Sequence, residues 1–144
     1  NNPVENVKKS QRLLITWITD EPEVYAKIQR YITAEDFTED LYRKVASRLF
    51  EDLSKGTYNP AAIISMFSDE EEQREAAALF NTNLPQLNTK QEKEKAFHDI
   101  VYAVKKNSYE YFSGQLGADV NALNKVISGK KALEELAKTH ISLD

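Results

Sequence analysis

The segment from Ala34 to Gly56 has an unusually wide apolar face, and this constrains the fold more than any other feature. When Phe37 is set at zero and each residue advances by about 100°, the apolar positions fall within an arc of roughly 180°. They are Leu41, Tyr42, Val45, Ala46, Leu49, Phe50 and Leu53. A helix on a protein surface needs an apolar stripe of only about 100°. This helix, expected over about 38–54, therefore lies at the centre of a bundle or is half-covered by something outside the chain.

Helix start and stop signals divide the rest of the chain. Asn, Asp, Ser and Thr cap helix starts, Pro fits the first turn, and Gly suits a helix end. These signals predict helices over about 3–19, over 21–32 after an Asp20 cap, and from Asn59-Pro60. They also predict helices from a Ser68-x-x-Glu71 capping box, from a Thr89-x-x-Glu92 capping box to about Ser113, and from Asp119 onward. The sequence leaves open whether Ser128-Gly129 breaks this last helix. Residues 81–88 are expected to form a loop.

No segment shows the strict alternation of a half-buried strand, so the predicted fold class is all-α. The expected architecture is a multi-helix bundle over 3–106, followed by a C-terminal antiparallel helical hairpin over 107–144. The long helix, beginning at about residue 89, is shared between the two parts.

Composition excludes several classes of function. A net charge of −4 lacks the basic footprint of a nucleic-acid-binding domain, so no direct nucleic-acid partner is expected. The chain has no Cys, which excludes disulfides and thiolate metal sites. No apolar run is long enough for a membrane span or a signal peptide, so no membrane partner and a cytoplasmic location are expected. The start NNPVENV, without Met, is interpreted as a domain cut from a larger protein or as a processed chain.

No arrangement of residues points to catalysis. The acids, including Asp36 and the run from Asp69 to Glu72, are interpreted as helix caps or solvated faces. His98 is expected on a helix surface and His140 near a helix C-terminus, too far apart in sequence for a metal motif. We therefore expect no catalytic residue, metal, cofactor or small-molecule substrate, and no enzyme activity in this chain on its own.

The last two helices carry more apolar surface than a hairpin uses internally. On the long helix, a stripe that includes Phe97 is accompanied by a second one with Tyr102, Tyr109 and Leu116. The final helix carries apolar positions from Val120 to Ile141 over roughly 200° if it is continuous. Such surface either packs on the preceding helices or contacts a partner protein. For the residues after 107, the sequence favours neither alternative over the other.

Four stretches resemble one family. KKSQRLLITWITDEPEVYAKIQRYI, AEDFTEDLYRKVASRLFEDLSKG and NPAAIISMF resemble the C-terminal helicase-binding domain of bacterial DNA primase (the DnaG class). KQEKEKAFHDIVYAVKKNSYEYFSGQLGADVNALNKVISGKKALEELAK is similar to that family's long helix and terminal hairpin. The resemblance runs from about Lys8 to the end and consists of hydrophobic patterns. The short NTNLPQLN loop and Gly129 depart from it.

The resemblance implies a non-catalytic adaptor whose parent protein would synthesise primers with a catalytic domain absent here. Its partner would be the N-terminal collar of the hexameric replicative DNA helicase (the DnaB class), whose activity it would modulate at the bacterial replication fork. The hairpin would make the main contact. The expected partner-binding residues are Tyr109, Tyr111, Phe112, Leu116, Leu123, Val126, Ile127, Leu133 and Leu136.

Two other hypotheses stay open. The N-terminal collar domain of the helicase itself is similar in fold and carries a segment like DFTEDLYRKVASRLFEDLSKG. The end of the chain soon after the hairpin and the acidic, Lys-containing long helix favour the primase. An unrelated small helical regulator is the third hypothesis.

Overall fold

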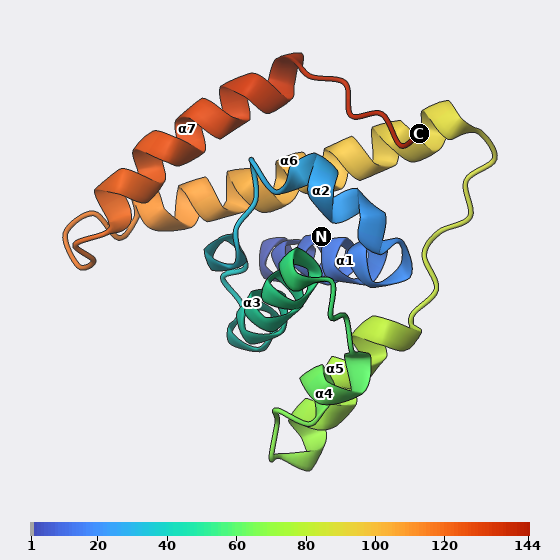
Figure 1. The fold of residues 1–144 in the computed structure, drawn as a ribbon. Helices are drawn as coiled ribbons and strands as arrows, with labels where there is room; N and C mark the ends of the chain where they lie inside the picture. The colour runs from blue at the N-terminus through green and yellow to red at the C-terminus, as the bar shows by residue number, and fades with distance from the viewer. Residues whose placement is uncertain (1) are drawn as a thin grey trace.

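Helices form all the regular structure in the computed structural model, which describes residues 2–144 (Figure 1). They are α1 (Pro3–Asp20), η1 (Pro22–Val24), α2 (Tyr25–Ile28), η2 (Ala34–Asp36), α3 (Asp40–Lys55), α4 (Pro60–Ile64), α5 (Glu70–Asn81), α6 (Lys90–Ser113) and α7 (Ala122–Lys138), where η marks a short 3-10 helix. The described residues contain no strand, which confirms the predicted all-α class. None of their helices is long and apolar enough to cross a membrane.

Side chains that cap the helix ends set several boundaries as the sequence predicts. The Asn59 side chain accepts a hydrogen bond from the amide of Ala62 at 3.3 Å and opens α4. The Thr89 hydroxyl accepts one from the amide of Glu92 at 3.1 Å and opens α6. Gly56 follows α3 with a φ of 70°, a left-handed conformation that costs glycine little.

Two predicted helix starts are displaced along the chain. The cap of α5 is Asp69 and not Ser68, because the Asp69 carboxylate accepts a hydrogen bond at 3.1 Å from the amide three residues on. A carboxylate caps a helix at least as well as a hydroxyl. The last helix begins at Ala122 and not at Asp119, whose carboxylate instead accepts from the Asn121 amide at 2.8 Å in the preceding turn.

The helix predicted over 21–32 is wrong as a continuous element, since η1 and α2 replace it and Asp20 belongs to α1. The amides of Tyr31 and Ile32 both donate to the carbonyl of Ile28, at 2.8 and 3.0 Å, so the chain turns just after α2. This turn seats both side chains in the core. Apolar burial thus outweighs the helical periodicity of the segment.

A tertiary contact sets the start of α3, which begins at Asp40 and not at about residue 38. Phe37 lies outside the helix, in an extended conformation with φ −88° and ψ 95°. The buried side chain of Gln11 on α1 donates to the Thr38 hydroxyl at 2.9 Å and accepts from the Glu39 amide at 3.1 Å. These bonds hold residues 38 and 39 in the connection to α3.

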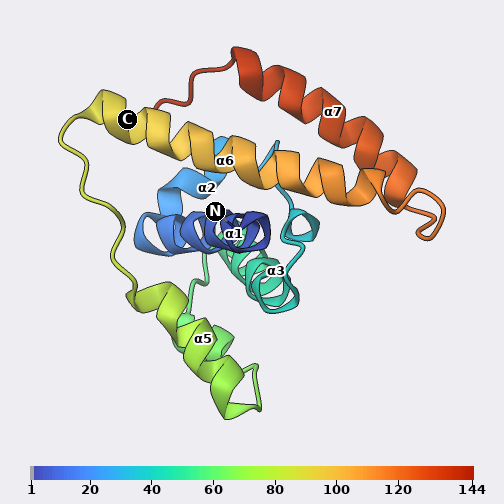
Figure 2. The same cartoon turned by 180° about the vertical axis from the view of Figure 1, so that it is seen from behind.

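The core surrounds α1, which packs against α3, α5 and α6 and lies in the middle of the molecule (Figures 1 and 2). Leu14, Ile15 and Ile18 of α1 are fully buried. The rings of Trp17 and Phe97 lie 5.1 Å apart and join α1 to α6.

The wide apolar face of α3 is covered by the chain itself. α3 packs against α1, α4, α5 and η2. The ring of Phe50 stacks on Tyr25 at 4.6 Å and meets the edge of Phe37 at 5.8 Å. The interpretation that this face is covered within a helical bundle is therefore confirmed, although α1 and not α3 is the most central helix.

The proposed division at residues 106 and 107 remains a prediction. Leu136 of α7 and Ile141 beyond it are buried in the same apolar cluster as α1 and α3. The C-terminal part of the chain is therefore joined to the bundle by apolar packing as well as by α6.

Candidate functional site

α7 runs back along α6 in antiparallel register (Figure 1). Early in α7, the ammonium of Lys125 lies 5.1 Å from the centre of the Phe112 ring, near the end of α6. Late in α7, the carbonyl of Leu136 lies 2.7 Å from Nε2 of His98, nearer the start of α6. The turn that joins the end of α6 to the start of α7 projects beyond α1 and α3, and we call it the distal end of the two helices (Figure 2).

The sequence leaves open whether Ser128-Gly129 interrupts the last helix, and the structure answers this, since α7 is continuous through both residues. Gly129 is buried where α7 crosses Tyr109 of α6. A Cβ at Gly129 would lie 3.3 Å from Cδ1 of Tyr109. The glycine therefore permits close approach of the two helices instead of ending one of them.

One flank of α7 faces the bundle through polar contacts. Arg30 pairs with Glu135 at 3.1 Å, and Lys125 pairs with Glu35 beside η2. Desolvation lowers the pKa of Lys125 below its ordinary value. These pairs connect the bundle-facing flank of α7 to residues 30 and 35, and because most of their side chains are exposed each adds little to stability.

The opposite flank of α7 faces away from these contacts and carries four apolar side chains, with the exposed Lys130 and Glu134 between them. Gly129 points at α6, and angles about the α7 axis are measured from its direction toward this flank. Helical geometry then places Val126 and Leu133 at about 40–60°, and Leu123 and Ile127 at about 120–160°. Tyr109 of α6 lies directly against Gly129, at the inner edge of this side. Together, Tyr109 and the four apolar residues of α7 form what we call the free flank.

Exposed large apolar side chains concentrate near the turn between α6 and α7. Eight such side chains occur in the described residues, and five of them lie between residues 111 and 127. They are Tyr111 at 49% exposure, Leu116 at 51%, Val120 at 95%, Leu123 at 58% and Ile127 at 61%, and we call them the distal apolar surface. Apolar side chains that gather on one exposed part of a protein often mark an interaction site.

The residues predicted to bind a partner fall into three groups. Tyr111, Leu116, Leu123 and Ile127 are exposed, whereas Tyr109, Val126 and Leu133 are half-buried along the free flank. Phe112 and Leu136 are buried, at 8% and 0% exposure: the ammonium of Lys125 lies over the Phe112 ring, and Leu136 belongs to the core cluster. A partner contact by these two remains a prediction that requires α7 to move. Val120, the most exposed of the set, was not among the predicted contacts.

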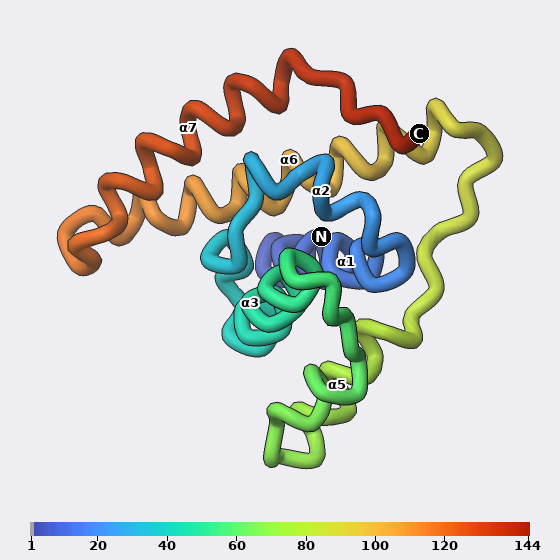
Figure 3. The backbone as a smooth tube through the Cα atoms, in the orientation of Figure 1, coloured from blue at the N-terminus to red at the C-terminus, as the bar shows by residue number. Residues whose placement is uncertain are grey.

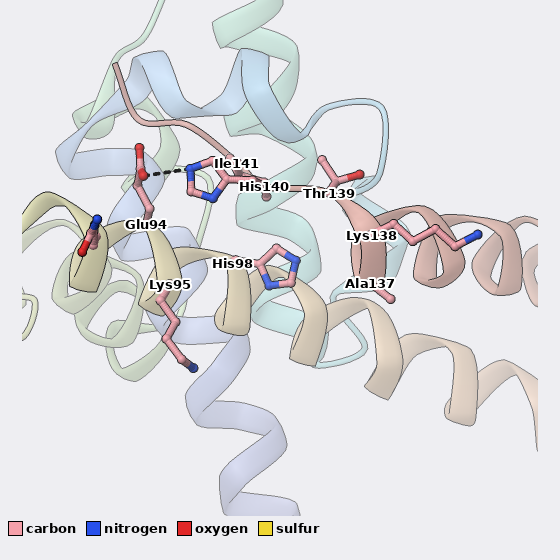
Figure 4. Close-up of a pocket in the computed structure, with 9 residues that line it drawn as sticks. Glu94, Lys95, His98, Ala137, Lys138, Thr139, His140 and Ile141 are labelled. Carbon is pink, nitrogen blue, oxygen red and sulfur yellow. Dashed lines mark ion pairs between the residues drawn. The ribbon is translucent and has the colours of Figure 1, made fainter.

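Both histidines lie beside a pocket of about 430 Å³ near the start of α6 (Figure 4). His98 is not a simple surface residue, because its imidazole meets the Leu136 carbonyl and is only 25% exposed. Nε2 of His140, two residues past α7, lies 3.0 Å from the carboxylate of Glu94. Within residues 2–144, no group of three or more His, Cys, Asp or Glu side chains is arranged to hold a metal ion.

A buried polar cluster joins η2 to α6. The expectation that Asp36 caps a helix is confirmed, whereas the expectation of a solvated side chain is wrong. Asp36 is 5% exposed, and its carboxylate accepts from Lys105 at 3.1 Å and from Ser108 at 2.7 Å. It also accepts from the amide of Thr33 at 2.8 Å, the local capping contact. The spacing Thr33-x-x-Asp36 is the one sequence signal for this contact, and nothing in the sequence indicates the partners on α6.

Comparisons of the chain with protein-family models, with curated proteins and with solved structures find no match. The functional assignment therefore rests on the residues and on the geometry described above. That geometry places exposed apolar side chains near the end of α6 and the start of α7.

Proposed function

We propose that this chain is the helicase-interaction domain of a bacterial DNA primase of the DnaG class. It docks primase, without catalysis of its own, on the N-terminal collar of the hexameric DnaB-class replicative helicase and modulates that helicase during primer synthesis. Its place is the cytoplasm, at the replication fork. The sequence resemblance motivates this proposal, and the all-α fold is compatible with it.

The observation that carries the proposal is the distal apolar surface. Five exposed apolar side chains within residues 111–127 are costly to leave in water, since each Å² of apolar surface removed from water stabilises a complex by about 25 cal/mol before the costs of association. Only two charged side chains interrupt this stretch, Asp119 near its middle and Lys125 near its end. The surface therefore suits a protein partner with an apolar face.

The arrangement of α6 and α7 also suits such a partner physically. Gly129 lets the helices lie close together, and the pairs at Arg30 and Lys125 connect the bundle-facing flank to residues 30 and 35. A partner then meets a surface that is already ordered, and less conformational entropy is lost on binding. Helical elements presenting apolar anchors at i and i+4, such as Leu123 and Ile127, are a common recognition mode.

The test is sedimentation of the domain with a purified hexameric DnaB-class helicase. We expect the domain alone to be a monomer and to co-sediment with the helicase. Leu123→Asp combined with Ile127→Asp should reduce affinity at least about 100-fold, because two apolar anchors become charged while the core is untouched. Val4→Asp is the matched control, since Val4 is 63% exposed on α1, away from the distal apolar surface.

Three results would count against the proposal. Equal loss of binding in the control and double variants would show that the effect is not specific to α7. Unchanged binding in the double variant would remove the assigned surface. Self-association without helicase binding would instead favour a helicase collar domain, an element that assembles with copies of itself.

A further inference from the structure

Residues 139–144, which we call the C-terminal strap, follow α7 and run back to lie beside the start of α6 (Figure 3). In both opposite views the end of the chain lies beside the first turns of α6 (Figures 1 and 2). The strap has no regular structure, so its position depends on the side chains that hold it.

Glu94 of α6 makes the main polar contacts with the strap. Its carboxylate is buried at 4% exposure, and one oxygen accepts a hydrogen bond from the amide of Leu143 at 2.7 Å. The other oxygen lies 3.0 Å from Nε2 of His140 (Figure 4). Both oxygens of one α6 carboxylate are therefore engaged by the strap.

Apolar seating supports this polar contact. Ile141 is 5% exposed and belongs to the main core cluster, and Leu143 packs against that cluster. The remaining ties are exposed: Lys90 pairs with the Asp144 carboxylate, and Lys27 donates to the Asp144 carbonyl at 2.9 Å. The strap is thus held by one buried carboxylate and two apolar side chains.

α7 by itself is lightly anchored. Its fully buried residues are Ala122, Gly129 and Leu136, of which two have little or no side chain. The strap adds Ile141 to this anchor just beyond the end of the helix. By contrast, α1 and α3 are buried along several turns, so we expect the free energy of opening to be lower at α7 and the strap than at α1 and α3.

We propose that residues 139–144 form a releasable strap: closed on Glu94 it fixes the C-terminal half of α7 along α6, and open it frees that half while the bundle stays folded. Opening exposes the part of the core that Ile141 covers, and it changes the position of α7. This proposal goes beyond the proposed function, because it does not depend on which partner binds the distal apolar surface.

Glu94 makes the strap sensitive to acid. The Leu143 amide first, and then the charges of His140 and Lys90, hold the pKa of Glu94 below its ordinary value of 4.5. The other charged or titratable groups lining this site are Lys95 and His98 on α6, Lys138 on α7 and Asp144 on the strap. A lowered carboxylate pKa means that the stabilisation is fully present above 4.5 and is lost as the pH falls through the lowered value.

Amide hydrogen exchange read by NMR tests the strap directly, with protection corrected for the intrinsic pH dependence of exchange. Glu94→Ala should lower the protection of the amides at 133–138 and 141–143 by about 10-fold or more, because a hydrogen bond to a charged group is lost. Protection in α1 and α3 should not change. Glu94→Gln, which keeps an acceptor oxygen for Leu143, should show a smaller loss and a weaker dependence on pH between 3 and 6, because only the exposed Asp144 pair then responds to acid on the strap.

Glu110→Ala is the matched control, because Glu110 is an exposed acid on the same helix. Ile141→Ala should open the strap as Glu94→Ala does, through lost packing instead of lost charge. Unchanged protection of α7 in Glu94→Ala, or an equal loss of protection throughout the chain, would overturn the proposal. Neither result bears on helicase binding, so the two proposals fail independently.

Discussion

Asp36 is expected to contribute more to stability than any other carboxylate in the chain. Its side chain is 5% exposed and accepts hydrogen bonds from the Thr33 amide at 2.8 Å, from Lys105 at 3.1 Å and from Ser108 at 2.7 Å. Asp36→Ala removes all three acceptor contacts. It also leaves the ammonium of Lys105, only 7% exposed, without its partner.

The unpaired Lys105 dominates the expected cost. Removing one partner of a buried ion pair costs about 3–5 kcal/mol, because the remaining charge is neither hydrated nor neutralised. The orphaned Ser108 hydroxyl and Thr33 amide add to this, although water entering the new space offsets part of their loss. We therefore expect Asp36→Ala to lower the free energy of unfolding by about 3–5 kcal/mol, a large fraction of the roughly 5–15 kcal/mol of a typical domain.

Urea unfolding followed by fluorescence measures this loss, since Trp17 is the single tryptophan and lies in the core. Asp36→Ala combined with Lys105→Met should recover most of the stability, because no buried charge then remains. Asp40→Ala is the control, an exposed acid with two ion pairs on the surface of α3, and should cost much less. If Asp36→Ala costs no more than Asp40→Ala, the buried cluster does not hold η2 on α6 as argued.

Three further changes test the packing and the caps by the same unfolding assay. Gly129→Val should cost about 2 kcal/mol, because its side chain would press on Tyr109, whereas Gly117→Ala has open space and should be nearly neutral; equal effects would contradict the close approach of α6 and α7. Thr89→Ala should cost about 1 kcal/mol by removing the cap of α6, and no change would mean that the cap is replaced by water. Phe97→Ala should cost about 3–5 kcal/mol, since the ring is fully buried against Trp17, and a cost below 1 kcal/mol would exclude this contact from the core.

Local signals predicted much of the secondary structure correctly. Asn59-Pro60, Thr89 and Gly56 act through the backbone within a few residues, so their effects are readable without knowledge of the fold. The predictions failed where a distant residue competes with such a signal. Gln11 of α1 holds residues 38 and 39 in an extended connection, and core burial bends the chain after Ile28.

The candidate surface was only partly predictable for the same reason. Periodicity identified an excess of apolar residues on the last two helices, and four predicted residues, including Leu123 and Ile127, are exposed. Periodicity alone does not say which flank of a helix its neighbours cover. Phe112 and Leu136 share the apolar pattern of the exposed residues but are buried.

By itself, the sequence determined that this protein is helical and where most of its helices begin and end, because caps and helical periodicity act over a few residues. Only the tertiary structure decided that Gly129 is a contact point and not a break, that Asp36 is buried beside Lys105, and that residues 139–144 return to Glu94. Each of these depends on two segments meeting in space. The free energy of such a contact belongs to the pair, so neither partner's local sequence reveals it.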